Sequence, residues 1–341
     1  MKSNPISEKF INFAITECKG SSHLYEYLSL KIAQDEEILE LASHARKGQP
    51  VPNLLFGAVH YLLLKGKNHN LKDFFPSIVD MPREDKEESF TYFKDFCERN
   101  KDEIIPILKS KLVQTNEVRR CAYLFPIFQY IFDIVKKPLA LIEIGTSAGM
   151  QLLWDKYSYS YGKNEIYGDK DSKVHISSKI KSDKSPSLQG SNPPVASRIG
   201  IDLNTIDLSN DEEYLWLNAL IWPEHNERRE LFEKAAEYVK VNPLILIEGD
   251  GIELLPGLSK GIPKEYCVCV FHTHVANQMS KEVRNSLLEQ VKWIGRDREI
   301  FHVYNNIQDR YLHLDYYIDG KEFVNTVGET DGHGRWFTWN L

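Results

Sequence analysis

The stretch LALIEIGTSAGMQLLW, residues 139–154, decides the fold of this chain. Residues 139–144 have the composition of a buried strand, and glycines at 145 and 149 bracket a tight turn. Apolar residues then recur at helical spacing, so we expect a helix over 147–155. A strand, a glycine turn and a helix in this order are typical of a cofactor-binding loop and also of a loop that carries a catalytic serine.

Two kinds of enzyme have loops of this form. The pattern Glu143-x-Gly145-x-Ser147-x-Gly149 resembles the acid–glycine loop of S-adenosylmethionine-dependent methyltransferases, and its last five residues match the serine elbow of the α/β-hydrolases. A serine elbow needs earlier strands, because a loop after one of them supplies the oxyanion donor. The residues before 139 indicate helix, which favours the methyl-donor loop. A hydrolase remains the alternative, because the triad order is matched by Ser147, Asp250 and then His272, His274 or His333.

The spacing of the glycines argues against a dinucleotide. A nicotinamide-binding loop has the pattern G-x-G-x-x-G, in which bare backbone approaches the pyrophosphate. Here Gly145 and Gly149 are four residues apart, and Ser147 stands where the close-approach glycine belongs. S-adenosylmethionine brings no phosphate to this turn, so the loop favours it as the cofactor.

Hydrophobic periodicity divides the chain into two domains. Residues 1–115 have helical spacing throughout, with 51–64 as the central helix of a bundle, and a further helix starts near Asn116 and runs to about 135. Residues 116–341 predict an α/β domain, because short apolar runs alternate with amphipathic helices. Its expected strands are 139–144, 198–203, 243–248, 266–271 and 299–304, with helices over 226–240 and 280–293.

The end of this domain departs from the alternation, and so does one internal segment. Residues 311–327 predict a hairpin around Asp319-Gly320, and residues 335–339 predict one more strand, so the sheet should end in antiparallel strands. Residues 157–197 are polar and predict an inserted hairpin or lid. The expected fold class is therefore α/β, a Rossmann-like methyltransferase sheet preceded by an all-helical N-terminal domain.

Composition and charge limit the classes of partner and the cellular location that the sequence predicts. The chain has 341 residues, a formal charge of −7 and five cysteines. The acidic balance argues against a dedicated nucleic-acid binder, and the odd, scattered cysteines predict reduced thiols in the cytoplasm. No apolar run reaches the ~18 residues of a membrane span, and the polar start predicts no signal peptide. We expect a small-molecule acceptor as the partner, and the sequence leaves the oligomeric state open.

Several segments together resemble a family of uncharacterised bacterial proteins that carry a methyltransferase-like domain behind a helical N-terminal region. The resemblance implies the fold and leaves the substrate open. It is carried by QTNEVRR (114–120), IEIGTSAGMQLLWDKYSYSYG (142–162), RIGIDLNTID (198–207), WLNALIWPEHNERR (216–229) and GHGRWFTW (332–339).

The methyltransferase arrangement assigns donor-binding roles to the strand ends. The methionine end of the donor would lie against Glu143, Gly145, Thr146, Ser147 and Gly149. Asp202 would accept hydrogen bonds from the ribose, and Asp250 would lie near the adenine. Helix capping or a turn is the alternative role for each acid. If the second strand instead lies within 165–177, the ribose role passes to Asp169 or Asp171.

Histidines after the fourth strand are the candidate bases. His272 or His274 would remove a proton from the acceptor, since that strand end faces the transferring methyl group in methyltransferases. A local structural role is the alternative. Zinc is disfavoured, because alternate residues of a strand face opposite ways. Asn116 and Glu117, at a helix start, and His333, between two glycines, are the expected substrate-binding residues. A helix cap is the alternative role of the first two, and a structural turn is that of His333.

Overall fold

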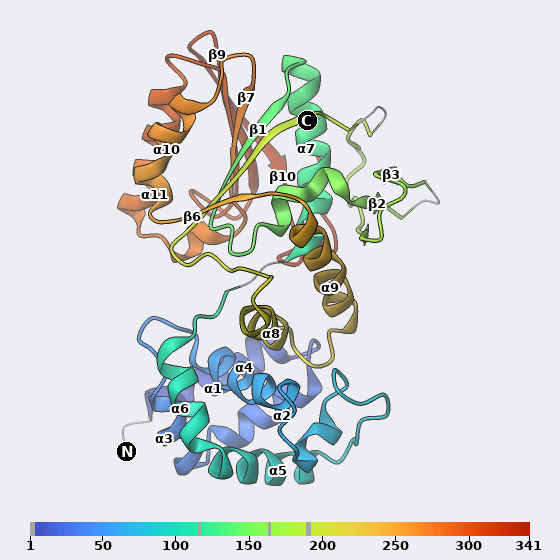
Figure 1. Cartoon of the computed structure of the whole chain (residues 1–341), viewed down its shortest axis with the longest axis vertical. Coiled ribbons are helices and arrows are strands. Elements are labelled where there is room, and N and C mark those ends of the chain that lie inside the picture. Colours follow the sequence, from blue (N-terminus) through green and yellow to red (C-terminus); the bar gives the residue numbers. More distant parts are fainter. Residues whose placement is uncertain (1–3, 115–116, 163–164, 189–191) are drawn as a thin grey trace. The chain divides into compact units, whose positions relative to one another are not determined.

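The computed structural model describes residues 4–114, 117–162, 165–188 and 192–341. The chain forms two compact units, traced in sequence colours in Figure 1. The first comprises residues 1–115 and 209–230, and the second comprises residues 116–208 and 231–341. Each unit is described separately below.

The first unit is helical throughout its described residues, as the periodicity predicts. Ser22, Asp35 and Asp85 begin three of its helices by accepting a backbone N–H bond, which satisfies donors that a helix start leaves free. Helix α4 is buried along nearly its whole length and lies in the core, as expected for residues 51–64. The helices are α1 (Pro5–Phe13), η1 (Ala14–Cys18), α2 (His23–Ile32), α3 (Glu36–Ser43), α4 (Val51–Leu64), η2 (Asn70–Phe74), α5 (Lys86–Arg99), α6 (Lys101–Ser110) and α8 (Asp211–Ala219).

Residues 209–230 group with this unit, although the sequence assigns them to the C-terminal domain. Helix α8 packs against α4, and the buried ring of His60 joins the two segments. Its Nδ1 lies 2.9 Å from the carbonyl oxygen of Ala219, and its Nε2 lies 2.8 Å from the hydroxyl of Ser77. Trp216 also donates from Nε1 to the carbonyl of Leu112 at 2.8 Å. The boundary between the units falls inside α9 (Asn226–Val241).

The second unit is built on a mixed seven-stranded sheet, so the α/β class and its antiparallel C-terminal strands are confirmed. The strand order is β10-β9-β8-β7-β1-β5-β6. The five strands from β8 to β6 are parallel, and β9 and β10 form the antiparallel hairpin expected around Asp319-Gly320. The strands are β1 (Leu139–Ile144), β5 (Val195–Asp202), β6 (Ile245–Glu248), β7 (Cys267–Phe271), β8 (Ile300–Tyr304), β9 (Leu312–Ile318) and β10 (Lys321–Gly328).

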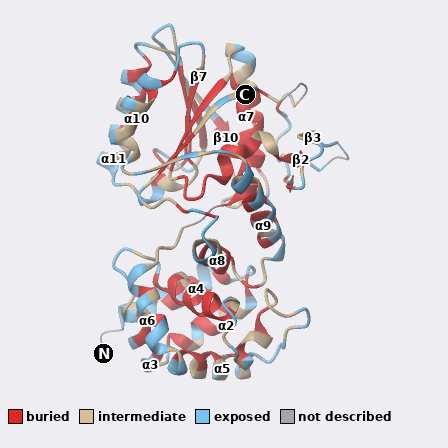
Figure 2. Ribbon diagram, viewed as in Figure 1, coloured by how far each residue is buried: buried red, intermediate tan, exposed pale blue. Residues whose placement is uncertain are grey.

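Helices cover both faces of this sheet. On one face α10 (Gly251–Gly261) and α11 (Lys281–Ile294) enclose an aliphatic core that includes Ile142, Val270 and Ile300. On the other face Phe128 of α7 (Cys121–Val135) contacts Phe271 of β7 and stacks on Trp154. The central strands are therefore buried on both sides, as the burial colours of Figure 2 show for β7. This burial explains their continuous apolar sequence.

The strand order reverses between β1 and β7. From β1 the chain continues to β5 and β6 on one side, and it then returns to β7 and β8 on the other side. The connections that leave β1 and β7 therefore diverge. In open α/β sheets, ligands bind at the carboxyl ends of the strands at such a reversal. This edge of the sheet is consequently the first place to search for a site.

Three local expectations differ from the structure, and a fourth is confirmed in part. Residues 147–155 do not form an α-helix; a 3₁₀ helix, η4 (Met150–Lys156), starts after Gly149, whose φ of 76° is left-handed, and kinks at Leu153. The hairpin expected within residues 157–197 is present as the antiparallel pair β2 (Ser158–Ser160) and β3 (Tyr167–Gly168), and β4 (His175–Ser177) adds a third strand parallel to β2. Residues 335–339 contribute isolated bridges at Phe337 in place of a strand. Helix α10 has no counterpart among the predicted helices.

Candidate functional site

The glycine loop after β1 depends on left-handed backbone at three positions. Gly145 and Gly149 both have φ of 76°, and Ser147 has φ of 51°. A Cβ atom on residue 145 would lie 2.6 Å from Cγ2 of Val275, so glycine is needed for space as well as for conformation. Val275 follows β7, and this contact therefore joins the two loops at the strand-order reversal.

Asp202, at the end of β5, holds the glycine loop in place. Its Oδ2 accepts the backbone N–H of Ser147 at 2.8 Å, and its Oδ1 accepts that of Asn204 at 3.0 Å. The N–H of Gly145 donates to the carbonyl of Ile201 at 2.8 Å, which ties the loop to the same strand. Burial raises the pKa of the Asp202 carboxyl. The structure thus places Asp202 beside the glycine loop, and its contact with a ribose stays a prediction.

Glu143 is a buried acid beneath the loop. Thr146 donates from its hydroxyl to Oε2 of Glu143 at 2.6 Å. Burial raises the pKa of Glu143 to about 8, the Thr146 hydrogen bond opposes this rise, and the Asp202 charge adds to it. Because residues alternate along a strand, Glu143 faces the α7 side of the sheet, away from Ile142.

Ser147 is not arranged as a nucleophile. Its Oγ is buried and makes no hydrogen bond with any described residue, so no described histidine activates it. The described residues before β1 contain no strand that could supply an oxyanion loop. The left-handed φ of Ser147 and its G-x-S-x-G sequence are features shared with a serine elbow.

Asp250 caps a helix. Its Oδ1 accepts the backbone N–H groups of Ile252 and Glu253, at 2.8 Å and 3.3 Å, at the start of α10. This is the capping role that the sequence leaves open for each acid. Contact with an adenine remains a prediction. The pattern Asp250-x-x-Glu253 is itself a helix-start signal, and it could have located α10 from the sequence.

The two candidate bases after β7 lie in different environments. His272 is fully buried on the α11 side of the sheet, and neither ring nitrogen has a hydrogen-bond partner among the described residues. Its ring centroid lies 5.3 Å from that of His302, which is equally buried. Burial lowers the pKa of His272 to about 3. The ring of His272 therefore offers no surface through which an acceptor could be reached.

His274 is held by two asparagines that follow β8. Its backbone N–H donates to Oδ1 of Asn305 at 2.8 Å, and the Asn306 amide lies 3.0 Å from the same oxygen and 3.2 Å from Nδ1 of His274. The NH₂ group of Asn306 donates to Oδ1 of Asn305, and the same NH₂ group faces Nδ1 of His274, which therefore accepts. The neutral ring consequently carries its proton on Nε2. Burial lowers the pKa of His274 to about 3, and the Arg120 charge adds to this effect.

Polar side chains from three further segments and from the adjacent Thr273 meet beside His274, and we call them the carboxyl-edge cluster. Arg120 donates from Nε to the carbonyl of Gly332 at 3.0 Å and from NH1 to the hydroxyl of Thr273 at 3.3 Å. Gln151 accepts from that hydroxyl at 3.0 Å and donates to the carbonyl of Glu117 at 3.2 Å. The cluster comprises Glu117, Arg120, Gln151, Thr273, His274 and His333.

Glu117 and His333 form an ion-pair-like contact within this cluster. Nδ1 of His333 lies 3.1 Å from Oε2 of Glu117, whose side chain is 3% exposed against 40% for His333. The structure therefore brings together two of the expected substrate-binding residues, far apart in sequence. The third, Asn116, lies outside the described residues. Sequence reasoning did not select Gln151, Thr273, Asn305 or Asn306, although the last three follow strand ends, where such residues gather.

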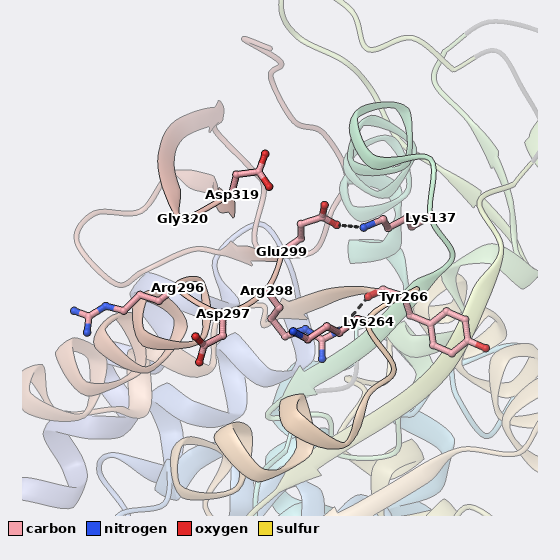
Figure 3. Close-up of a pocket in the computed structure, with 9 residues that line it drawn as sticks. All are labelled: Lys137, Lys264, Tyr266, Arg296, Asp297, Arg298, Glu299, Asp319 and Gly320. Atoms are coloured by element: carbon pink, nitrogen blue, oxygen red, sulfur yellow. Dashed lines mark hydrogen bonds and ion pairs between the residues drawn. The ribbon is translucent and has the colours of Figure 1, made fainter.

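A hollow lies at the opposite, amino-terminal edge of the sheet. It has a volume of about 260 Å³ and is lined by residues that precede β1, β7 and β8 and by the β9–β10 turn at Asp319-Gly320. Figure 3 shows two contacts among these residues: Lys137 pairs with Glu299 at 2.7 Å, and Arg298 donates to the carbonyl of Tyr266 at 3.1 Å.

The described residues hold no group of three or more His, Cys, Asp or Glu side chains placed to bind a metal ion. Within the same residues, no helix combines the length and the apolar character that crossing a membrane requires. All five cysteines are free and buried.

Fold and site together define an α/β protein with a helical first unit and a polar cluster where the order of its parallel strands reverses. The profile of one family, described as uncharacterised proteins conserved in bacteria (DUF2332), matches residues 7–339. The chain therefore belongs to the DUF2332 family. Searches of curated proteins and of solved structures find no significant match.

Proposed function

We propose that this protein binds S-adenosylmethionine and transfers its methyl group to a small-molecule acceptor. The observation that carries the proposal is the position of the glycine loop. It follows the first strand of the sheet and meets the loop after β7, at the reversal of strand order. In chain order the parallel strands lie 3-2-1-4-5, which is the order of a Rossmann-like, doubly wound sheet.

The chemistry of the loop suits a nucleoside with an amino-acid tail. A Cβ atom at residue 145 would clash with Val275, so the bare backbone of Gly145 faces the loop after β7. The Oγ of Ser147 is a buried polar atom without a hydrogen-bond partner among the described residues. Gly145 to Gly149 would hold the methionine end of the donor. When bound, S-adenosylmethionine supplies a methyl group already activated by its sulfonium, so the protein chiefly has to orient the acceptor.

Asp202 remains compatible with the predicted ribose contact. Its Oδ2 accepts the N–H of Ser147 and its Oδ1 accepts that of Asn204, and a carboxylate has about four acceptor positions, so it can also accept a ribose hydroxyl. The same carboxylate would then fix both the loop and the sugar. Cytoplasmic location, which the buried free cysteines suit, stays part of the proposal.

Two other functions keep a specific supporting feature. The left-handed Ser147 would suit a serine hydrolase, and stable labelling of Ser147 by a fluorophosphonate would favour that function. A non-catalytic nucleoside-binding protein would share the loop but would bind donor and product without any turnover.

Thermal unfolding with a matched ligand series tests donor binding. A ligand that binds only the folded protein raises the unfolding temperature in a concentration-dependent way. We expect S-adenosylmethionine and S-adenosylhomocysteine to raise it, and NAD and methionine to leave it unchanged. Equal effects of NAD and S-adenosylhomocysteine would contradict the proposal. A ligand that binds can then be used with methyl-labelled donor to screen hydroxyl, amine and carboxyl acceptors.

A further inference from the structure

We infer that His333, oriented by the carboxylate of Glu117, is the general base of the proposed methyl transfer, in place of His272 or His274. The inference rests on the proposed function and identifies a residue that acts within it. Glu117 would be a positioning residue, because it acts through the imidazole.

The geometry of the pair is that of a carboxylate–histidine dyad. Oε2 of Glu117 lies 3.1 Å from Nδ1 of His333, and Oε1 accepts the backbone N–H of Arg119 at 3.3 Å. A carboxylate bound at Nδ1 keeps the ring proton there, which leaves the lone pair of Nε2 free to accept a proton. Nε2 of His333 makes no hydrogen bond with any described residue, and the side chain is 40% exposed. An acceptor molecule can therefore reach it.

The other two candidate bases, His272 and His274, each lack either an accessible ring or a ring nitrogen that is free to accept a proton. His272 is enclosed in the core, so no substrate reaches its ring. His274 accepts from Asn306 at Nδ1, so its Nε2 carries a proton and acts as a donor. Of the three histidines, only His333 combines exposure with a carboxylate partner.

Hydrogen bonds connect the dyad to the glycine loop. Gln151, which lies directly beyond the loop in η4, donates to the backbone carbonyl of Glu117 at 3.2 Å. The same side chain accepts from Thr273, at the end of β7. The base is thus held by the same strand ends that would hold the donor.

The proton balance of the step is complete without a further reactant. A lone pair of the acceptor oxygen or nitrogen forms the new bond to the methyl carbon, and the electron pair of the broken carbon–sulfur bond passes to sulfur. The acceptor proton moves to Nε2 of His333. The resulting imidazolium is stabilised by the Glu117 carboxylate, and the thioether product is neutral at sulfur.

The charge of the bound ligand provides a test that needs no acceptor. S-adenosylmethionine and S-adenosylhomocysteine differ by the methyl group and by the positive charge at sulfur. If His333 lies beside the transferring methyl group, its ring experiences the electric field of the sulfonium, and the neutral thioether exerts no such field. The experiment records histidine ring resonances by NMR at one fixed pH in the full-length protein with each ligand, and His333→Asn assigns the signal.

We expect the ring resonances of His333 to differ between the protein bound to S-adenosylmethionine and the protein bound to S-adenosylhomocysteine. His313, which contacts Asp309 at 2.9 Å, is the matched control. It lies on β9, three strands from β1, and its ring resonances should be the same with both ligands. Without ligand, Glu117→Gln should shift the ring resonances of His333, because the variant removes the carboxylate that lies 3.1 Å from Nδ1. The other charged groups around the pair stay constant between the two ligands, and they are Arg120, His274, Asp331 and Arg335.

The outcomes separate the two proposals. If both ligands bind and the ring resonances of His333 are the same with each, the base assignment is wrong and donor binding stands. If neither ligand binds, the proposed function fails and the base assignment fails with it. A purely structural ion pair would respond to Glu117→Gln but would not distinguish the two ligands.

Discussion

Asp202 and Ser147 are joined by a hydrogen bond of 2.8 Å from the serine backbone to Oδ2 of the carboxylate. The contact connects the end of β5 to the turn after β1, its neighbour in the sheet. The other carboxylate oxygen accepts from Asn204. A single side chain therefore fixes two loops at the carboxyl edge of the sheet, where we place the methyl donor.

Replacing Asp202 by Asn should destabilise the protein, because the new NH₂ group would face the backbone N–H of Ser147 or that of Asn204. We expect a loss of about 1–3 kcal/mol in the free energy of unfolding, measured in urea. Asp250→Asn is the matched control. Both of its bonds go to Oδ1, and Asn caps helices nearly as well as Asp, so its cost should stay below about 1 kcal/mol. Equal losses of stability in the two variants would show that the Asp202 carboxylate does not need both of its oxygens to hold the loops.

Gly145→Ala should be costly for two separable reasons. Left-handed backbone costs a non-glycine residue about 1–2 kcal/mol, and crowding against Val275 adds about 1–3 kcal/mol. Gly320→Ala isolates the first cost, because Gly320 has φ of 71° and no atom within 4 Å of its Cβ position. Urea unfolding should rank Gly145→Ala as the more destabilised variant. The reverse ranking would mean that the two loops do not pack as described.

Glu143 should make stability depend on pH in the neutral range. Its pKa is raised to about 8 from an ordinary value of 4.5, so the folded protein binds a proton that the unfolded chain releases between these values. Stability from this group is complete below pH 4.5 and is lost as pH rises towards 8. Relative to Glu143→Gln, the wild type should lose up to about 1.4 kcal/mol per pH unit between pH 5 and 8. A constant difference between the two proteins across this range would contradict the buried, protonated acid.

His272 should lower the stability of the protein as pH falls, a pH dependence opposite to that of Glu143. Its pKa is lowered to about 3 from 6.5, so the unfolded chain takes up a proton that the folded protein excludes. Stability from the neutral ring is present above pH 6.5 and is lost as pH falls towards 3. His272→Leu should therefore gain on the wild type by up to about 1.4 kcal/mol per pH unit below pH 6. Urea unfolding at pH 7 and pH 5 measures this gain, and its absence would place the ring in contact with water.

Local patterns in the sequence predict the parts of the fold that short-range physics controls. The buried strand 139–144 is correct to the residue, the Asp319-Gly320 hairpin has the two left-handed residues that its turn requires, and α4 follows from an apolar run too long for a strand. These elements depend on neighbouring residues alone, so one sequence suffices to find them.

Long-range contacts explain what the sequence does not reveal. Residues 209–230 join the first unit because His60 and Trp216 find partners across more than a hundred residues of chain. The pairing of Glu117 with His333 is equally remote. The failed helix over 147–155 has a local cause, because left-handed Ser147 and Gly149 cannot continue a right-handed helix. No periodicity in the sequence reports these dihedrals.

Isothermal titration calorimetry with S-adenosylhomocysteine tests the central claim most directly. We predict saturable heat with one ligand bound per chain, and a clearly weaker signal for Gly145→Val, whose side chain enters the donor loop, than for the control Gly320→Val. The absence of heat at roughly millimolar ligand, equivalent to binding weaker than about 4 kcal/mol, would contradict a methyl-donor site at this edge of the sheet.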